Sequence, residues 1–147
     1  MDLTTDDLDR LVTWTLIRAA HRAQRELTQL FADHGLSPVQ FGVLSHLATG
    51  ERFTQARLAR EVLVRPQSLS GVLDGLVARG LVAREEDRGK GRRNPLVLTA
   101  AGQDLLAAVW PRLQDANRPD QLGLAPQEAA ALNDVLLRLV REPGVDG

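Results

Sequence analysis

Apolar residues recur at helical spacing through the first quarter of the chain. Between residues 5 and 33 they come every three or four positions, which predicts one long amphipathic helix over 5–33. Its apolar positions are Leu8, Leu11, Val12, Leu16, Ala19, Ala23, Leu27 and Leu30. Gly35 follows, and glycine readily adopts the left-handed conformation that ends many helices. We therefore expect the first helix to stop just before Gly35.

Five further helices are predicted by the same spacing together with start and stop signals. Ser37, Thr54 and Thr99 carry short hydroxyl side chains that accept hydrogen bonds from first-turn amides, so each is expected to cap a helix. Proline fits the first position of a helix and glycine the position after its end, which places Pro66 at a start and Gly80 at an end. The predicted ranges are 38–49, 55–61, 66–79, 100–117 and 126–142.

Between these helices the pattern changes to short extended runs. The runs at 81–86 and 96–99 flank a loop rich in glycine and arginine, which predicts an antiparallel hairpin. Arg52–Phe53 is a candidate for a further, very short strand. The order of elements predicts a mainly α-helical fold with a small β-hairpin wing. In this fold a winged helix-turn-helix core is flanked by N- and C-terminal helices.

Composition narrows the classes of protein that fit. At 147 residues and 44% hydrophobic content, the chain is long enough for a single domain with its own core. It has no cysteine, which excludes disulfides and cysteine nucleophiles, and three histidines leave few metal ligands, so no cofactor is expected. No apolar run approaches the roughly 20 residues that span a bilayer. The acidic N-terminus is unlike a signal peptide, so we expect a cytoplasmic protein.

The net charge of −1 hides an uneven distribution along the chain. Residues 51–99 carry ten Lys/Arg and six Asp/Glu, whereas residues 1–50 and 100–147 each contain more acidic than basic residues. A basic middle segment is the electrostatic pattern that a DNA-binding module needs. Every cation except Lys90 is an arginine, a side chain that binds phosphate and guanine through paired hydrogen bonds.

The predicted helices at 55–61 and 66–79 have the arrangement of a helix-turn-helix motif. Their apolar positions would share a core, and the second helix would present its N-terminal polar residues to a DNA groove. Arginine and glutamine suit guanine and adenine edges, whereas hydroxyl groups suit phosphates. The candidate DNA-binding residues of this motif are Thr54, Gln55, Arg65, Gln67, Ser68 and Ser70.

The loop between the two predicted strands is strongly basic. Its cations are Arg88, Lys90, Arg92 and Arg93. We expect them to contact the minor groove or the DNA backbone, although a merely solvated basic loop would have the same composition. Arg84 lies on a predicted strand beside Glu85, where an internal ion pair and a DNA contact are equally open.

These segments resemble the MarR family of transcriptional regulators along the whole chain. The matching pieces are Leu58-Ala59, the run from Val64 to Ser70, the run from Leu76 to Arg84, and the segment from Asp87 to Thr99 with Gly102. Gly71 and Gly75 stand where many members carry arginine or another polar residue, and Lys90 where an aspartate is common. Each of these helical glycines is expected to cost about 1 kcal/mol relative to alanine.

The resemblance implies one subunit over 1–147, with a winged-helix DNA-binding lobe over 36–99 and a helical dimerisation lobe over 5–33 and 100–142. It implies a homodimer and repression relieved by a small ligand, with Arg92 as the wing arginine in the minor groove. The apolar stripes of the terminal helices also need a covering surface. A second subunit would set two recognition helices about 34 Å apart on an inverted-repeat operator. Packing within one subunit is the alternative.

A further stripe on the first predicted helix suits a ligand. Trp14 offers an aromatic face, and Arg18 and His21 offer donors to a carboxylate or phenolate. In similar proteins the effector cleft lies between this helix and the DNA-binding lobe, so we expect a small aromatic or phenolic acid. The candidate ligand-binding residues are Trp14, Ile17, Arg18, His21, Phe41 and His46. As alternatives, Trp14 would lie in a dimer core, His21 at the surface and Phe41 in the subunit core.

Two other functional classes compete with this interpretation. An enzyme is disfavoured because the sequence lacks a glycine-rich phosphate loop, a G-x-S-x-G elbow and an H-E-x-x-H motif. A winged helix that binds a protein partner, with weakened DNA binding, would fit Gly71, Gly75 and Lys90. The residues and the resemblance together predict a sequence-specific DNA-binding transcriptional regulator that acts as a ligand-responsive repressor.

Overall fold

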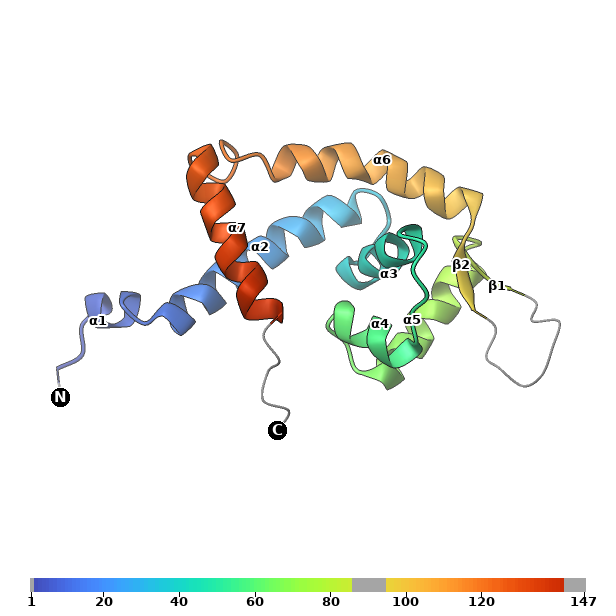
Figure 1. Ribbon diagram of the computed structural model, residues 1–147, viewed down its shortest axis with the longest axis horizontal. Helices are drawn as coiled ribbons and strands as arrows, with labels where there is room; N and C mark the ends of the chain where they lie inside the picture. Colours follow the sequence, from blue (N-terminus) through green and yellow to red (C-terminus); the bar gives the residue numbers. More distant parts are fainter. Residues whose placement is uncertain (1, 86–94, 142–147) are drawn as a thin grey trace. The chain divides into compact units, whose positions relative to one another are not determined.

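The computed structural model describes residues 2–85 and 95–141 (Figure 1). The chain divides into two units, residues 1–109 and 110–147, and the boundary falls within the sixth helix. The described elements are α1 (Thr5–Asp9), α2 (Val12–Ala32), α3 (Pro38–Ala48), α4 (Gln55–Glu61), α5 (Pro66–Ala78), β1 (Val82–Arg84), β2 (Leu96–Leu98), α6 (Ala100–Ala116) and α7 (Pro126–Arg141). The prediction of a mainly α-helical fold with one β-hairpin is confirmed.

The first predicted helix, 5–33, is two helices in the structure. α1 ends at Asp9 and α2 begins at Val12, because Leu11 is extended, with φ −81° and ψ 100°. No side chain caps the start of α2. The apolar spacing runs through this break, so periodicity alone could not reveal it.

Contacts around the break explain why it forms. The Thr4 hydroxyl accepts a hydrogen bond from the Asp7 N–H, and the Asp7 carboxylate accepts from the Thr4 N–H and hydroxyl. These bonds to Thr4 lower the pKa of Asp7 and cap the N-terminus of α1. On the other side, Arg18 lies 2.6 Å from the Asp9 carboxylate, and the Thr15 hydroxyl donates to the Asp9 carbonyl.

Most predicted helix boundaries are confirmed. Ser37 and Thr54 accept hydrogen bonds from the amides of Gln40 and Arg57, as N-caps do. Gly35 and Gly80 end α2 and α5 in the left-handed region, at φ +67° and +69°. The candidate strand at Arg52–Phe53 is wrong, because both residues lie outside regular structure in the connection to α4.

The core of the first unit lies around α3, which packs against α2, α4, α5 and β2 (Figure 1). Phe31 of α2 is buried and stacks on Phe41 of α3, with ring centroids 4.2 Å apart. The buried hydrophobic residues are Phe31, Leu36, Val43, Leu44, Leu58, Ala59, Val62, Leu69, Leu73, Leu76, Leu81, Val82 and Val109. Full burial of one such large side chain contributes about 1.5–3 kcal/mol, so this cluster fixes α4, α5 and the hairpin on one base.

A tight junction joins the end of α5, the hairpin and the start of α6. The Thr99 hydroxyl donates to the Gly80 carbonyl at 2.7 Å and accepts from the Gly102 N–H at 3.1 Å. The Thr99 N–H donates to the Leu81 carbonyl. Position 102 has no room for a side chain, because a Cβ there would lie 2.3 Å from the Leu81 carbonyl oxygen.

The turn between α4 and α5 contains a backbone outlier. Leu63 has φ +58°, in the left-handed region that glycine normally occupies after a helix. The Val64 N–H donates to the Ala59 carbonyl and the Leu63 N–H to the Arg60 carbonyl, which is the Schellman pattern. A side chain in this conformation costs roughly 1–2 kcal/mol.

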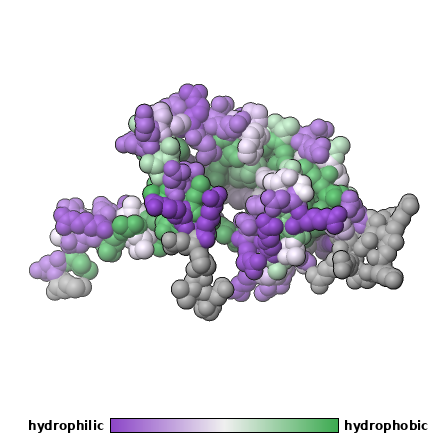
Figure 2. Space-filling view, viewed as in Figure 1, coloured by the Kyte–Doolittle hydropathy of each residue, from purple (hydrophilic) through white to green (hydrophobic). Residues whose placement is uncertain are grey.

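The terminal helices leave large apolar side chains exposed. α7 has no buried residue, and one stripe of it contains Leu132, Val135, Leu139 and Val140, all exposed. At the N-terminal end, from residue 3 to residue 17, the exposed large apolar side chains are Leu3, Leu8, Leu11, Val12, Trp14, Leu16 and Ile17. Figure 2 shows hydrophobic surface where α1 meets α2. Among the described residues, no helix combines the length and apolar content of a membrane span.

Candidate nucleic-acid interface

α5 has two chemically distinct faces. Leu69, Leu73 and Leu76 are buried against the rest of the first unit, at the spacing of one helical stripe. The residues turned away from that stripe are exposed: Arg65, Gln67, Ser68 and Ser70. The structure therefore gathers the four α5 candidates at the exposed N-terminal end of the helix.

The N-terminus of α5 is suited to negatively charged partners. Arg65 is the N-cap residue, with an extended backbone, and its carbonyl accepts from the Ser68 and Leu69 amides. Its guanidinium makes no capping bond, and Pro66 occupies the first helical turn. The positive end of the helix dipole and the Arg65 charge lie together, which favours phosphate or base-edge acceptors.

The two remaining motif candidates tie α4 to α5. The Thr54 hydroxyl accepts from the Arg57 N–H and caps α4. Gln55 Nε2 donates to Ser70 Oγ at 2.8 Å, which joins the first residue of α4 to the exposed side of α5. Sequence reasoning predicted both residues as candidates but did not predict their contact, which fixes how the two helices present their polar groups.

The β-hairpin forms as predicted, in an antiparallel register that pairs Val82 with Leu98 and Arg84 with Leu96. The Glu85 N–H donates to the Pro95 carbonyl at 2.9 Å, which brings the two ends of the wing loop together. The wing candidates lie outside the described residues: Arg88, Lys90, Arg92 and Arg93. Their DNA contacts stay a prediction.

Arg84 makes the ion pair that the sequence left open. Its Nη2 lies 3.3 Å from the Asp74 carboxylate on α5. Both side chains are exposed, so the pair contributes at most about 1 kcal/mol. Its effect is geometric, because it connects the recognition helix to the first strand of the wing.

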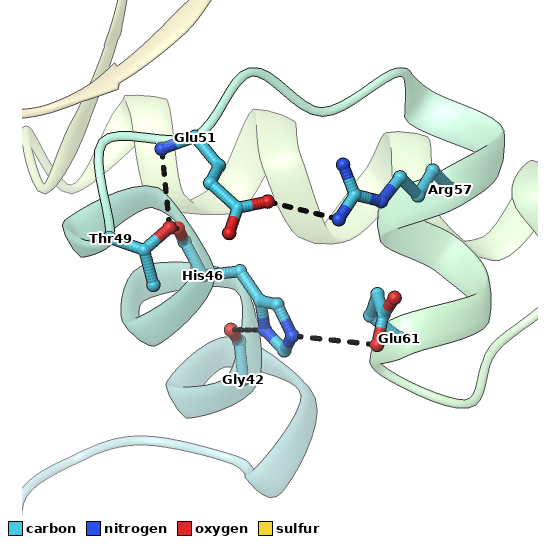
Figure 3. Close-up of polar contacts among 6 residues, drawn as sticks. All are labelled: Gly42, His46, Thr49, Glu51, Arg57 and Glu61. Atoms are coloured by element: carbon cyan, nitrogen blue, oxygen red, sulfur yellow. Dashed lines mark hydrogen bonds and ion pairs between the residues drawn. The ribbon is translucent and has the colours of Figure 1, made fainter. Parts of the chain in front are cut away.

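A polar and aromatic cluster connects α3 to α4 (Figure 3). His46 Nδ1 donates to the Gly42 carbonyl at 2.7 Å, and its Nε2 lies 3.8 Å from Glu61 Oε2. The His46 ring meets Phe53 edge to face, and the Arg57 guanidinium lies 4.5 Å from the centre of the Phe53 ring. Arg57 Nη2 also lies 3.0 Å from Glu51 Oε2. Sequence reasoning missed the Phe53, Arg57 and Glu61 members, because their partners lie four to fifteen positions away across a loop with no regular spacing.

The six ligand-binding candidates fall into two groups. Trp14, Ile17, Arg18 and His21 lie on an exposed part of α2, where Arg18 pairs with Asp9. Phe41 and His46 lie on α3, where one stacks on Phe31 and the other faces Glu61. Within 2–85 and 95–141, none of the hydrogen bonds, ion pairs or ring contacts joins the two groups. Their shared ligand role stays a prediction.

Gly71 weakens α5 without serving its packing. A Cβ at Gly71 would meet nothing within 4 Å. Gly71→Ala is therefore expected to raise the free energy of unfolding by about 0.5–1 kcal/mol, the helix-propensity difference, as measured by chemical denaturation. Gly50→Ala is the matched control, because Gly50 is equally open but has φ +75° and should destabilise when substituted. Shifts in the same direction would contradict this account of both glycines.

The α4–α5 pair, its exposed polar face and the adjacent hairpin define a winged helix-turn-helix DNA-binding protein. A model of the MarR family matches residues 34–93. The HTH-type transcriptional repressor Rv2887 of Mycobacterium tuberculosis is 32% identical over 97 residues, which are 66% of this chain and 70% of that protein. The chain therefore belongs to the MarR family of transcriptional regulators.

Two solved structures are similar over almost the whole chain. The transcriptional repressor CouR, bound to a 23-mer DNA duplex, has a TM-score of 0.81 and 27% identity, and the match covers 96% of this chain and 100% of CouR. The Mycobacterium tuberculosis MarR family protein Rv2887 in complex with salicylic acid has a TM-score of 0.73 and 26% identity, covering 87% and 95%. The similarity therefore extends beyond the motif to the flanking helices.

Proposed function

We propose that this transcriptional regulator is a repressor that binds an inverted-repeat DNA operator as a homodimer. The observation that carries the proposal is the polar face of α5, which begins at Arg65 and lies opposite buried Leu69, Leu73 and Leu76. A helix with this division can enter a major groove while its other face stays in the core. The likeness to CouR bound to DNA supports the same use of the motif.

The proposal divides the chain into a DNA-binding lobe over 36–99 and a dimerisation lobe over 5–33 and 100–142. Support comes from the terminal helices, whose large apolar side chains are exposed in the single subunit. A second copy would cover them and set the two α5 helices about one duplex turn apart. The wing cations, Arg92 above all, would then reach the minor groove beside each recognition helix.

The effector that we propose is a small aromatic or phenolic acid. Support comes from the likeness to Rv2887 in complex with salicylic acid. Trp14 would offer an aromatic face, and Arg18 and His21 would offer donors to the carboxylate. The two recognition helices can stand at different distances in two conformations of the dimer. Such a ligand can release DNA only if its affinity differs between these two conformations.

The competing classes are less well supported. The relatives are transcriptional regulators, and on that basis we propose that this protein acts by binding and not by catalysis, and that it does so in the cytoplasm. A winged helix that binds only a protein partner is not favoured, because α5 keeps its polar N-terminal face.

Arg65→Ala tests the proposal directly. We expect operator affinity to fall about tenfold or more, because a well-placed arginine contact to a base contributes roughly 1–3 kcal/mol. Affinity is measured by fluorescence anisotropy on a duplex selected from a random pool by the wild-type protein, over a range of salt concentrations. Arg22→Ala on α2 is the control, because it removes the same charge from an exposed position. Equal losses for both variants would exclude Arg65 as a contact residue.

A further inference from the structure

Leu63 combines a left-handed backbone conformation with an exposed aliphatic side chain. Among the described residues it is the one non-glycine residue with positive φ, and its side chain is 90% exposed. Glycine or asparagine would close the same Schellman turn with less strain. The Leu63 side chain therefore does not stabilise the single subunit, because it is exposed to water and its backbone is strained. We look for its role in a contact with another molecule.

The position of Leu63 indicates what it would contact. Its neighbours Val62 and Val64 are buried and half-buried, so the turn directs only Leu63 outward. Arg65, the N-cap of the recognition helix, follows two residues later. Arg60, whose carbonyl accepts the Leu63 N–H, is also exposed. Glu61 of the same turn is exposed as well and lies 3.8 Å from His46, so the charged residues around Leu63 are two arginines and one glutamate, with a net positive charge.

A DNA duplex has the chemistry that matches this surface. Phosphates attract the arginines, and a duplex also presents apolar groups, namely thymine methyls in the major groove and the carbons of deoxyribose. A protein partner with an apolar patch would match Leu63 but would have to bury the two arginines or supply acids for them. The charge pattern therefore favours DNA.

We propose that Leu63 is a further DNA-contact residue, which makes an apolar contact with the operator from the turn of the helix-turn-helix motif. This inference rests on the proposed function, because it requires that α5 enters a groove. It adds to the polar candidates a residue that recognises carbon atoms of the duplex and makes no contact with phosphate.

Two substitutions separate the contact from the strain. Leu63→Gly removes the side chain and relieves the backbone, whereas Leu63→Ala removes most of the side chain and keeps the strain. We expect both variants to lose about fivefold in operator affinity, since both lose the buried apolar area. Only Leu63→Gly should raise the thermal unfolding temperature. The slope of affinity against salt should be unchanged, because no phosphate contact is lost.

The probe is a duplex that the wild-type protein selects from a random-sequence pool. Leu3→Ala is the control, because Leu3 is an exposed leucine that precedes α1 and lies outside both the motif and the proposed dimerisation lobe. The operator affinity of this variant should equal that of the wild type. Deoxyuridine placed at each thymine in turn distinguishes the two sources of apolar contact. If one substitution lowers the affinity of the wild-type protein but not that of Leu63→Gly, Leu63 contacts the thymine methyl at that position. If no substitution lowers the affinity of the wild-type protein in this way, Leu63 contacts deoxyribose.

The possible failures are distinct. If the wild-type protein selects a duplex and both Leu63 variants bind it as tightly, the Leu63 contact is excluded while the proposed function stands. If the Leu63 variants lose affinity and their affinity also depends less steeply on salt, the substitutions have displaced an arginine from a phosphate. The apolar contact is then excluded as well. If the wild-type protein selects no duplex at all, the proposed function fails, and the Leu63 contact fails with it.

Discussion

Leu139→Asp is expected to dissociate the dimer and to lower operator affinity by about 10²–10⁴-fold, while each subunit stays folded. The loss is large because two linked recognition helices bind their half-sites with an avidity of that order, which separate subunits lack. Leu139 lies in the apolar stripe of α7 with Leu132 and Val135, and its side chain is 53% exposed in the single subunit. An aspartate there stays hydrated in a monomer but would be buried without a partner in a dimer.

The measurement combines light scattering for the mass with anisotropy for the affinity, and circular dichroism checks that the helices persist. Ala130→Asp is the matched control, because Ala130 is exposed on the same helix but lies away from the stripe. This control should remain a dimer. A Leu139→Asp protein that keeps the mass and affinity of the wild type would show that α7 does not form the subunit interface.

Gly102→Ala is expected to lower the free energy of unfolding by about 2–3 kcal/mol, within the usual range for overpacking a core. The added Cβ would lie 2.3 Å from the Leu81 carbonyl oxygen and 2.6 Å from a methyl of Leu98. The first of these is backbone and cannot rotate away. Either the Thr99 hydrogen bonds to Gly80 and Gly102 must break, or the hairpin must move relative to α6.

This destabilisation is measured by chemical denaturation at one fixed protein concentration, because the proposed dimerisation would make the apparent stability depend on concentration. Gly71→Ala supplies the comparison, since the same substitution in an open helical position is expected to stabilise. If Gly102→Ala lowers the free energy of unfolding and Gly71→Ala raises it, the steric effect of the added Cβ is distinguished from its effect on helix propensity. A neutral or stabilising Gly102→Ala would mean that the junction can open without cost.

Much of the fold could be predicted because the signals for helix boundaries are local. Ser37, Thr54 and Thr99 accept hydrogen bonds from amides three residues later, so each cap acts within one turn. The break between α1 and α2 was missed because the contact that holds it, Asp9 with Arg18, spans nine residues. The spacing of apolar residues along the chain does not predict such a contact.

The candidate site divides in the same way. The exposed polar face of α5 follows from the spacing of its leucines, so Arg65 and Gln67 could be predicted as surface residues. The Gln55–Ser70 hydrogen bond joins residues fifteen positions apart, and its two partners meet only because α4 packs on α5. Leu63 gave no signal at all, since its significance is a dihedral angle that the turn imposes.

The sequence by itself determined the order of the elements, the helix caps, the leucine stripe of α5 and the basic character of the middle segment. These properties depend on neighbours within one or two turns, where spacing and residue type are sufficient. Only the tertiary structure decided the pairing of Arg84 with Asp74, the His46 cluster and the need for Gly102. Each of these depends on atoms that packing brings together from distant parts of the chain, and no local pattern encodes that distance.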